Sequence, residues 1–325
     1  MTLYTTHVGS YPLEFSSESF KIALLDSIKV GLDYPPHPQL RDFVKMFLEP
    51  LIERGIIEAV GETFKLVGKF APEDVPNVSL FEQDRMIEIL SRIKPPIRGK
   101  RACITGPFTL SSRIQERGSD LMGSMLANKR ELDKMVGYVK GFVERAYKLG
   151  FEMIVVDEPI LSVIIGRRIL FNYSREEIVE NLNSLFEGIK SEYRGIHVCG
   201  VLSPSLKDIL LQVENINLLD HEHKDFPRNL DVYTREELET HDKFLALGVL
   251  SSKRPVVEEV EEIVEAIQEG LRRYGDRVKF IKGDCGFRGL RGYRGAYEIS
   301  IRKLANLVRA RKVVLDESES KDTPL

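Results

Sequence analysis

Short apolar runs alternate with longer amphipathic stretches along almost the whole chain, and this alternation limits the fold more than any other feature. The short runs predict strands at residues 55–60, 100–105, 151–156, 195–198, 216–220, 243–250 and 277–283. The longer stretches predict helices at residues 80–93, 126–149, 174–193, 205–213, 256–274 and 296–311. Because strands separated by helices join in parallel, the pattern predicts βαβ units around a parallel sheet.

Two parallel architectures fit this pattern, an open doubly wound sheet and a closed barrel. A doubly wound sheet that binds a dinucleotide carries a glycine-rich phosphate loop after its first strand, and the sequence has no such loop there. A length of 325 residues is normal for one barrel. We therefore expect a single (β/α)8 TIM barrel over residues 1–315, with its active site at the C-terminal ends of the strands, and a disordered tail over residues 316–325.

Composition and charge exclude several classes of protein. With 42% hydrophobic and 30% charged residues, the chain can bury a large core and stay in solution. The formal net charge of −3 is evenly spread, so we expect no nucleic-acid partner and no membrane partner. The N-terminus lacks the basic and apolar regions of a signal peptide, and the three cysteines lie far apart. These features predict a cytoplasmic protein with reduced thiols.

Reactive polar side chains follow the C-terminal ends of several predicted strands, and in a barrel these ends meet at one face. The residues are Glu62, Asp157, Glu158, His197, Cys199, Glu222 and Cys285. The sharpest local signal is His197-Val198-Cys199, because residues i and i+2 of a strand point to the same side. Together with Cys285, this pair offers one imidazole and two sulfurs, a ligand set that suits zinc. The alternative is a buried pair without a ligand role.

The segment His221-Glu222-His223 leaves a further ligand open. If the strand continues, the two histidines share one face and Glu222 takes the other. Either Glu222 or the histidine pair can then join the metal, and periodicity alone does not decide between them.

An ordered set of short motifs connects these residues to a known family. The motifs are Thr6-His7-Val8-Gly9-Ser10-Tyr11-Pro12, Gly61-Glu62, Gly106-Pro107-Phe108-Thr109, Asp157-Glu158-Pro159, His197-Val198-Cys199-Gly200, Asp220-His221-Glu222 and Asp284-Cys285-Gly286. In this order and spacing, the chain resembles the catalytic half of cobalamin-independent methionine synthase over residues 6–311, and the shorter archaeal-type core methionine synthases in particular. The resemblance implies a zinc-dependent methyltransferase that methylates homocysteine to methionine.

The resemblance also implies roles for individual residues. It implies that Zn²⁺ is held by His197, Cys199, Glu222 and Cys285, with Asp220 close enough to rival Glu222. It implies that the amino acid is held by Val8, Gly9, Ser10, Glu62 and Asp157. Carboxylates suit the ammonium group of homocysteine, and backbone amides with a serine hydroxyl suit its carboxylate. A free thiol has a pKa near ~8.5, and a zinc ion deprotonates the thiol that it binds.

Two departures from the family concern the methyl donor. The folate-using members carry a tryptophan that stacks on the pterin. This chain has no tryptophan, and the corresponding position is at about Arg113. They also carry a histidine implicated in protonating the donor, whereas this chain has Lys253, which becomes its candidate catalytic residue. We therefore expect the donor to be methylcobalamin or a corrinoid protein rather than methyltetrahydrofolate.

Two other functions stay open at this point. Corrinoid-dependent methyltransferases that act on another thiol, such as coenzyme M, also resemble barrels with a His-x-Cys pair and a later cysteine. The motifs around Ser10, Glu62 and Asp157 favour an amino acid acceptor instead. A non-catalytic barrel subunit that completes a partner's site is the second alternative, and the intact ligand set argues against it.

Overall fold

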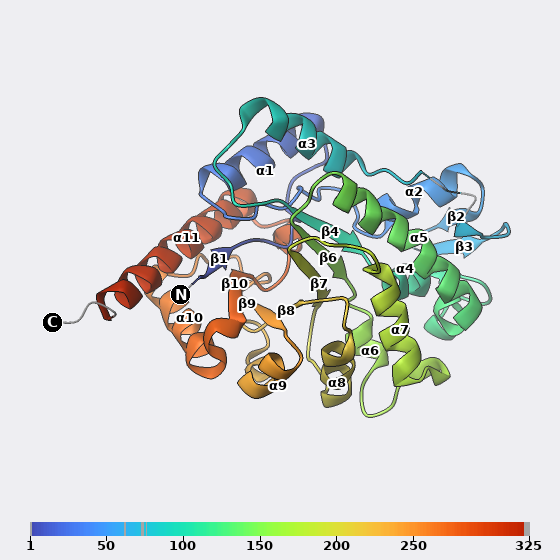
Figure 1. Ribbon diagram of the computed structural model, residues 1–325. Coiled ribbons are helices and arrows are strands. Elements are labelled where there is room, and N and C mark those ends of the chain that lie inside the picture. Colours follow the sequence, from blue (N-terminus) through green and yellow to red (C-terminus); the bar gives the residue numbers. More distant parts are fainter. Residues whose placement is uncertain (1, 62, 73–74, 76, 322–325) are drawn as a thin grey trace.

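The computed structural model describes residues 2–61, 63–72, 75 and 77–321. A seven-stranded parallel sheet lies at its centre and curls inside a layer of helices (Figure 1). The strand order is β1-β10-β9-β8-β7-β6-β4. These strands are β1 (Tyr4–Thr5), β4 (Arg101–Thr105), β6 (Met153–Asp157), β7 (Tyr193–Val198), β8 (Leu218–His221), β9 (Phe244–Leu250) and β10 (Val278–Gly283). Strands β4, β6 and β8 are buried along their whole length, as expected for parallel strands covered on both faces.

Helices connect the strands and form the outer layer. They are α1 (Ser17–Lys29), α2 (Lys45–Glu53), α3 (Phe81–Ile93), α4 (Pro107–Arg113), α5 (Lys129–Lys148), α6 (Leu161–Ile164), α7 (Arg175–Leu185), α8 (Pro204–Gln212), α9 (Arg235–Thr240), α10 (Val260–Tyr274) and α11 (Ala296–Lys321). Local sequence explains the start of α7: Ser174 accepts from the backbone N–H of Glu177, while the Glu177 carboxylate accepts from that of Ser174. Short 3₁₀ turns lie at Leu121–Gly123, Met125–Ala127, Leu170–Asn172, Pro227–Asp231, Gly275–Arg277 and Phe287–Leu290.

The two edges of the curled sheet approach each other through residues 34–37. Thr6 forms an isolated parallel bridge with Tyr34, and Pro36 forms another with Arg101. Consecutive prolines at 35 and 36 lack N–H donors, which prevents a regular strand here. The predicted α/β fold with a parallel sheet is therefore confirmed, while the described part of the chain shows seven strands in this sheet and no regular eighth one.

One predicted strand lies in a different sheet. β2 (Ile57–Val60) pairs antiparallel with β3 (Thr63–Leu66), and β3 pairs with β5 (Ile114–Gln115), forming a separate three-stranded sheet. The expectation that residues 55–60 belong to the central sheet is wrong. The physical reason is exposure: three of the four residues of β2 face solvent, whereas a strand of the central sheet would be buried on both sides.

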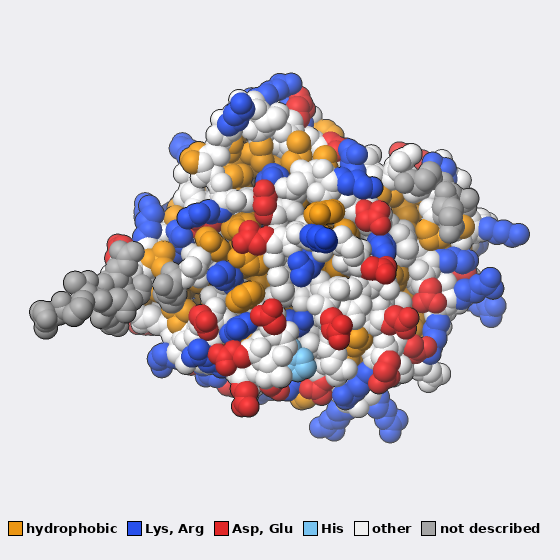
Figure 2. Space-filling model, in the orientation of Figure 1, with side chains coloured by type: hydrophobic (Ala, Val, Ile, Leu, Met, Phe, Trp, Pro, Cys, Tyr) orange, Lys and Arg blue, Asp and Glu red, His pale blue; other side chains and the backbone are white. Residues whose placement is uncertain are grey.

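The C-terminal helix is longer than the sequence pattern predicts. The helix expected at residues 296–311 extends to Lys321, so residues 316–321 of the expected tail are helical. Residues 322–325 lie outside the described residues, and the domain boundary at 315 stays a prediction. None of the described helices combines the length and apolar character that a bilayer span requires. On the face shown in Figure 2, acidic and basic side chains are interspersed.

Helix α5 anchors the outer layer through Phe142, which is fully buried between Phe47 and Tyr138, with ring centroids 5.1 and 5.4 Å away. We expect Phe142→Ala to lower the free energy of unfolding by about 3–5 kcal/mol, because it leaves a cavity that the packed core cannot close. Exposed Tyr147 on the same helix is the control, and its change to alanine should cost at most about 1 kcal/mol. Urea unfolding checks both values, and equal losses would contradict this account.

Candidate metal centre and substrate pocket

Three neighbouring strands bring polar residues to the same level at their C-terminal ends. In the sheet register, Asp157 of β6 is the partner of His197 of β7, and His197 is the partner of Asp220 of β8. All three side chains are buried, at 6% exposure or less. Parallel pairing thus places a row of ionisable groups across the end of the sheet, where barrel enzymes carry their active sites.

One imidazole and two sulfurs meet at this end of the sheet. His197 Nε2 lies 3.0 Å from Cys199 Sγ, and Cys199 Sγ lies 3.5 Å from Cys285 Sγ. One ligand atom from each of the three residues falls within 4.8 Å of the other two. The structure therefore brings together side chains that are 2 and 86 residues apart in sequence, in an arrangement that a metal ion could bridge.

Asp220 lies behind His197 rather than beside the sulfurs. Its Oδ1 is 2.6 Å from His197 Nδ1, and this contact leaves Nε2 directed at Cys199. Arg101 and Lys282 each form a buried 2.8 Å ion pair with the same carboxylate. Burial alone would raise the pKa of Asp220, but these two cations hold it well below its ordinary value. Asp220 is thus placed to orient the imidazole, as carboxylates commonly do behind metal-bound histidines.

Glu222 borders the same pocket as the three clustered residues, while the neighbouring histidines do not. Its Oε2 accepts a hydrogen bond from the backbone N–H of Gly200, 2.7 Å away. His221 Nε2 lies 3.1 Å from the Tyr233 hydroxyl, and His223 Nδ1 accepts from the backbone N–H of Gly248. Glu222 thus borders the pocket, whereas the three side chains whose ligand atoms lie within 4.8 Å of one another are His197, Cys199 and Cys285.

The cluster stabilises negative charge on sulfur. A hydrogen bond from the Cys199 thiol holds the pKa of Cys285 well below its ordinary value, and nearby His197 acts in the same direction. The same interaction, together with burial, raises the pKa of Cys199. Burial would lower the pKa of His197, but Asp220 outweighs it and raises that pKa to about 10. The two sulfurs thus differ in acidity, and Cys285 is the more acidic of the pair.

A pocket of about 480 Å³ opens over this cluster. Its lining includes Val8, Ser10, Gln39, Arg41, Phe43, Asp157, Pro159, His197, Cys199, Glu222, Ser252, Lys253, Cys285, Gly286, Arg288 and Gly289. Gly9 shapes the turn between Val8 and Ser10: its φ is +103°, and its carbonyl accepts from the backbone N–H of Gln39. Glu62, the remaining predicted substrate residue, lies outside the described residues.

Asp157 offers the pocket a carboxylate with spare hydrogen-bonding capacity. Its Oδ1 is buried and has no hydrogen-bond partner among the residues that the structure describes. Burial raises the pKa of Asp157 to about 7, against the opposing effects of His197 and Arg101. A buried carboxylate of this kind is stabilised when a cationic group binds beside it.

The adjacent Glu158 has a structural role. Its carboxylate accepts from the backbone N–H groups of Phe108 and Thr109, both at 2.8 Å, at the start of α4. These contacts satisfy donors that the first turn of a helix leaves free. Glu158 therefore fastens α4 to the end of β6.

Lys253 stands at the rim of the pocket. Its side chain is 56% exposed, and its Nζ lies 4.0 Å from Glu222 Oε2. The same ammonium lies over the Phe226 ring, 4.1 Å from the centroid. Lys253 is thus near enough to meet a molecule that enters the pocket and exposed enough to move.

Two residues that the sequence analysis missed hold the loops that follow β7 and β8, which carry Cys199 and Glu222. Asn229 Nδ2 donates to the backbone oxygens of Gly200 and Glu222, at 2.8 and 2.7 Å. The Asp284 carboxylate accepts from three successive backbone N–H groups, those of residues 223, 224 and 225. Asp284 lies in a motif beside Cys285 and could have been suspected, whereas no local pattern marks Asn229.

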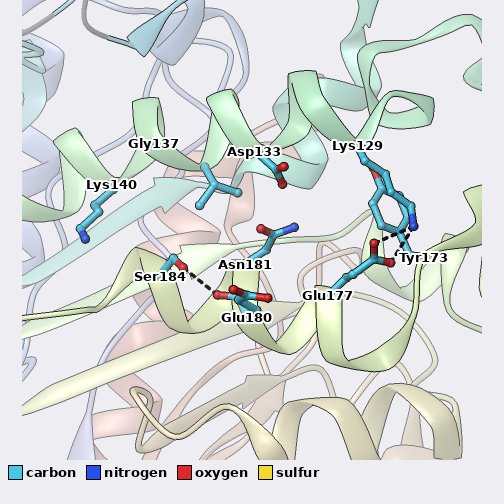
Figure 3. Close-up of a pocket in the computed structure, with 10 residues that line it drawn as sticks. Lys129, Asp133, Gly137, Lys140, Tyr173, Glu177, Glu180, Asn181 and Ser184 are labelled. Carbon is cyan, nitrogen blue, oxygen red and sulfur yellow. Dashed lines mark hydrogen bonds and ion pairs between the residues drawn. The ribbon is translucent and has the colours of Figure 1, made fainter.

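A second pocket, of about 450 Å³, lies away from this chemistry between α5 and α7 (Figure 3). Lys129 Nζ donates to both Glu177 carboxylate oxygens at 2.7 Å, and Ser184 donates to the backbone oxygen of Glu180. None of the predicted site residues lines this groove.

Comparison with known proteins identifies relatives along nearly the whole chain. The methionine synthase of Methanocaldococcus jannaschii is 25% identical over 96% of this chain and 99% of its own length. The methionine synthase of Methanothermobacter thermautotrophicus is 27% identical over 95% of this chain and 99% of its own. No protein family model matches the chain.

Solved structures support the same fold. A B12-independent methionine synthase from Shewanella sp. W3-18-1, in complex with selenomethionine, has a TM-score of 0.67 at 15% identity and covers 98% of this chain and 100% of its own. A putative vitamin-B12-independent methionine synthase from Listeria monocytogenes has a TM-score of 0.63 at 16% identity and covers 91% of this chain and 86% of its own. The relationship predicted from the sequence motifs is thus confirmed: the chain is a homologue of the archaeal methionine synthases and an enzyme of the methyltransferase class.

Proposed function

We propose that this enzyme forms methionine by moving a methyl group onto the thiol of homocysteine, with zinc as its cofactor. The observation that carries the proposal is one pocket that combines the His197, Cys199 and Cys285 cluster with the carboxylate of Asp157, whose Oδ1 has no partner among the described residues. In a substrate that carries both a thiol and an ammonium group, the thiol would face the His197, Cys199 and Cys285 cluster, and the ammonium would face Asp157. Homology to the methionine synthases supports the same substrate.

The donor set fits zinc, because two cysteine sulfurs and one imidazole are ligands that this ion prefers. His197, Cys199 and Cys285 would hold it, with Glu222 as the fourth ligand. Zinc, when bound, supplies a Lewis acid that keeps a substrate thiol in its nucleophilic thiolate form near neutral pH. Because both cysteines must stay reduced, we place the protein in the cytoplasm.

The other pocket residues would orient the amino acid. Asp157 would pair with the ammonium group, and the Val8-Gly9-Ser10 turn would bind the carboxylate through backbone N–H groups and the serine hydroxyl. Ser10 is anchored to the loop after Cys285, since its carbonyl accepts from the backbone N–H of Phe287 at 2.8 Å. That contact sets the spacing between the carboxylate end of the substrate and the sulfur cluster. Glu62 stays a predicted second carboxylate.

The methyl donor in this proposal is a methyl-corrinoid, either methylcobalamin or a corrinoid protein. By the sequence resemblance, Arg113 lies at about the position where the folate-using members carry a stacking tryptophan. It borders a pocket of about 250 Å³ that shares Phe43 and Pro159 with the main pocket. Lys253 at the rim would orient the donor or protonate it. We also propose that residues 34–37 close the sheet as the eighth member of a barrel, because they bridge both edge strands.

The zinc assignment is tested by cysteine replacements. Wild-type protein should bind about one zinc per chain, and Cys285→Ala should lose most of it, because a tetrahedral site needs all its ligands. Cys103→Ala is the matched control, since Cys103 is buried within β4 and should not be needed for zinc. Elemental analysis after gel filtration measures the content. A zinc-free wild-type protein would contradict the proposal and favour the non-catalytic subunit.

The acceptor assignment is tested at Asp157. Asp157→Ala should lower kcat/KM for homocysteine about 10- to 100-fold, the value of one charge-assisted hydrogen bond. It should hardly change the rate with 4-mercaptobutanoate, which is homocysteine without its amine. Asp157→Asn controls for packing and should behave like the alanine variant. Equal losses with both thiols would argue for an acceptor without an ammonium group, such as coenzyme M.

The donor is tested by supplying each candidate in turn. We expect methionine from homocysteine and methylcobalamin, and much less from homocysteine and methyltetrahydrofolate, because the pocket lacks a tryptophan for pterin stacking. Methionine is measured by mass spectrometry with equal donor concentrations. Efficient turnover of methyltetrahydrofolate alone would refute the corrinoid proposal while leaving the methionine-forming reaction intact.

A further inference from the structure

A fully buried ammonium group lies directly behind the candidate metal centre. Lys282 on β10 has an exposure of 0%, and its Nζ lies 2.8 Å from Asp220 Oδ1. The same Nζ is within hydrogen-bond distance of three backbone oxygens, those of His221 at 3.1 Å, Gly283 at 2.9 Å and Asp284 at 2.8 Å. A lysine with this many polar partners is held rigidly.

Three of the four partners of Lys282 contact or directly precede candidate ligands. Asp220 holds the imidazole of His197, the carbonyl of His221 immediately precedes Glu222, and that of Asp284 immediately precedes Cys285. β8 ends at His221 and β10 ends at Gly283, so Glu222 and Cys285 lie just beyond the hydrogen-bonded strands. One ammonium group therefore links the segments that carry these ligands at the point where sheet hydrogen bonding ends.

The charges behind the centre match a metal-thiolate group in front of it. Arg101, Lys282 and Asp220 are all fully buried, and as a trio they carry one net positive charge, with the buried carboxylates of Asp157 and Asp284 nearby. An unbalanced buried charge is unfavourable. A divalent cation held by two thiolates and one carboxylate would have one net negative charge, opposite in sign to that of the trio.

We propose that Lys282 is a positioning residue of the metal centre. It ties Asp220 and the backbone beside Glu222 and Cys285 into one unit, and its charge offsets that of the thiolates. This inference rests on the zinc site proposed above, and it assigns the lysine no contact with zinc or substrate.

The chain contains a matched control for this lysine. Lys243 is also buried, at 2% exposure, and its Nζ donates to the backbone oxygens of Val213 and Ile216 at 2.7 and 2.6 Å. It immediately precedes β9, so it lies at the N-terminal ends of the strands, opposite the site. Lys243→Met removes a buried ammonium and its carbonyl contacts without touching the candidate ligands.

The test compares metal binding by full-length wild type, Lys282→Met, Lys282→Gln and Lys243→Met. Zn²⁺ affinity is measured by competition with a chelating dye, the Co²⁺-loaded proteins are compared by their thiolate charge-transfer and d–d spectra, and thermal midpoints report folding. We expect Lys282→Met to weaken Zn²⁺ binding about 10- to 100-fold and to change the Co²⁺ spectrum, as loss of a residue behind the ligands does. Lys282→Gln keeps an N–H donor without the charge and should lose less.

Lys243→Met should lower the thermal midpoint while leaving affinity and spectrum at wild-type values. An unchanged affinity and spectrum in Lys282→Met, or an equal change in Lys243→Met, would overturn the inference. Should Lys282→Met fail to fold, the Zn²⁺ affinity and Co²⁺ spectrum of Lys282→Gln are compared with those of Lys243→Met instead, and unchanged values in Lys282→Gln would then overturn the inference. A wild-type chain that binds neither metal overturns the proposed zinc site as well, whereas wild-type binding that Lys282→Met leaves intact overturns this inference alone.

Discussion

The buried carboxylate of Asp220 is the interaction on which the site geometry depends. It contacts Arg101 from β4, Lys282 from β10 and His197 from β7, so a single group on β8 connects four strands of the sheet. Charges buried in a medium of low polarity interact strongly, but an unpaired one is very unfavourable. The four groups are therefore stable only together, and their mutual dependence holds the imidazole in one orientation.

Sulfur and carboxylate groups lie at separate positions around this network at the end of the sheet. On the pocket side of His197 lie the sulfurs of Cys199 and Cys285, and one strand away lies the carboxylate of Asp157. Two cations hold the pKa of Asp220 well below its ordinary value, whereas burial raises the pKa of Asp157 to about 7. Two aspartates at the same level of the sheet, one on each side of β7, thus differ in their surroundings: Asp220 lies in a network of buried ion pairs, and Asp157 keeps an unpartnered oxygen among the described residues.

Much of the fold could be predicted because parallel strands leave a clear pattern. The runs at residues 151–156 and 195–198 became β6 and β7 with small shifts at their ends, since strands covered on both faces must be apolar throughout. The run at residues 55–60 shows the limit of that reasoning. An apolar run indicates a strand but not its partners, and β2 pairs in a hairpin outside the central sheet.

The sequence by itself determined the alternating fold, the motifs of the methionine synthase relatives and the ligand types on offer, because these follow from residue order and side-chain chemistry. Only the tertiary structure decided how the ionisable groups divide their roles. It turned His221 toward Tyr233 and His223 toward Gly248, set Asp220 behind His197, and brought Lys282 to the backbone beside Glu222 and Cys285. These outcomes depend on which strands adjoin and where their ladders end, and contacts between residues some 60 positions apart leave no local trace in the sequence.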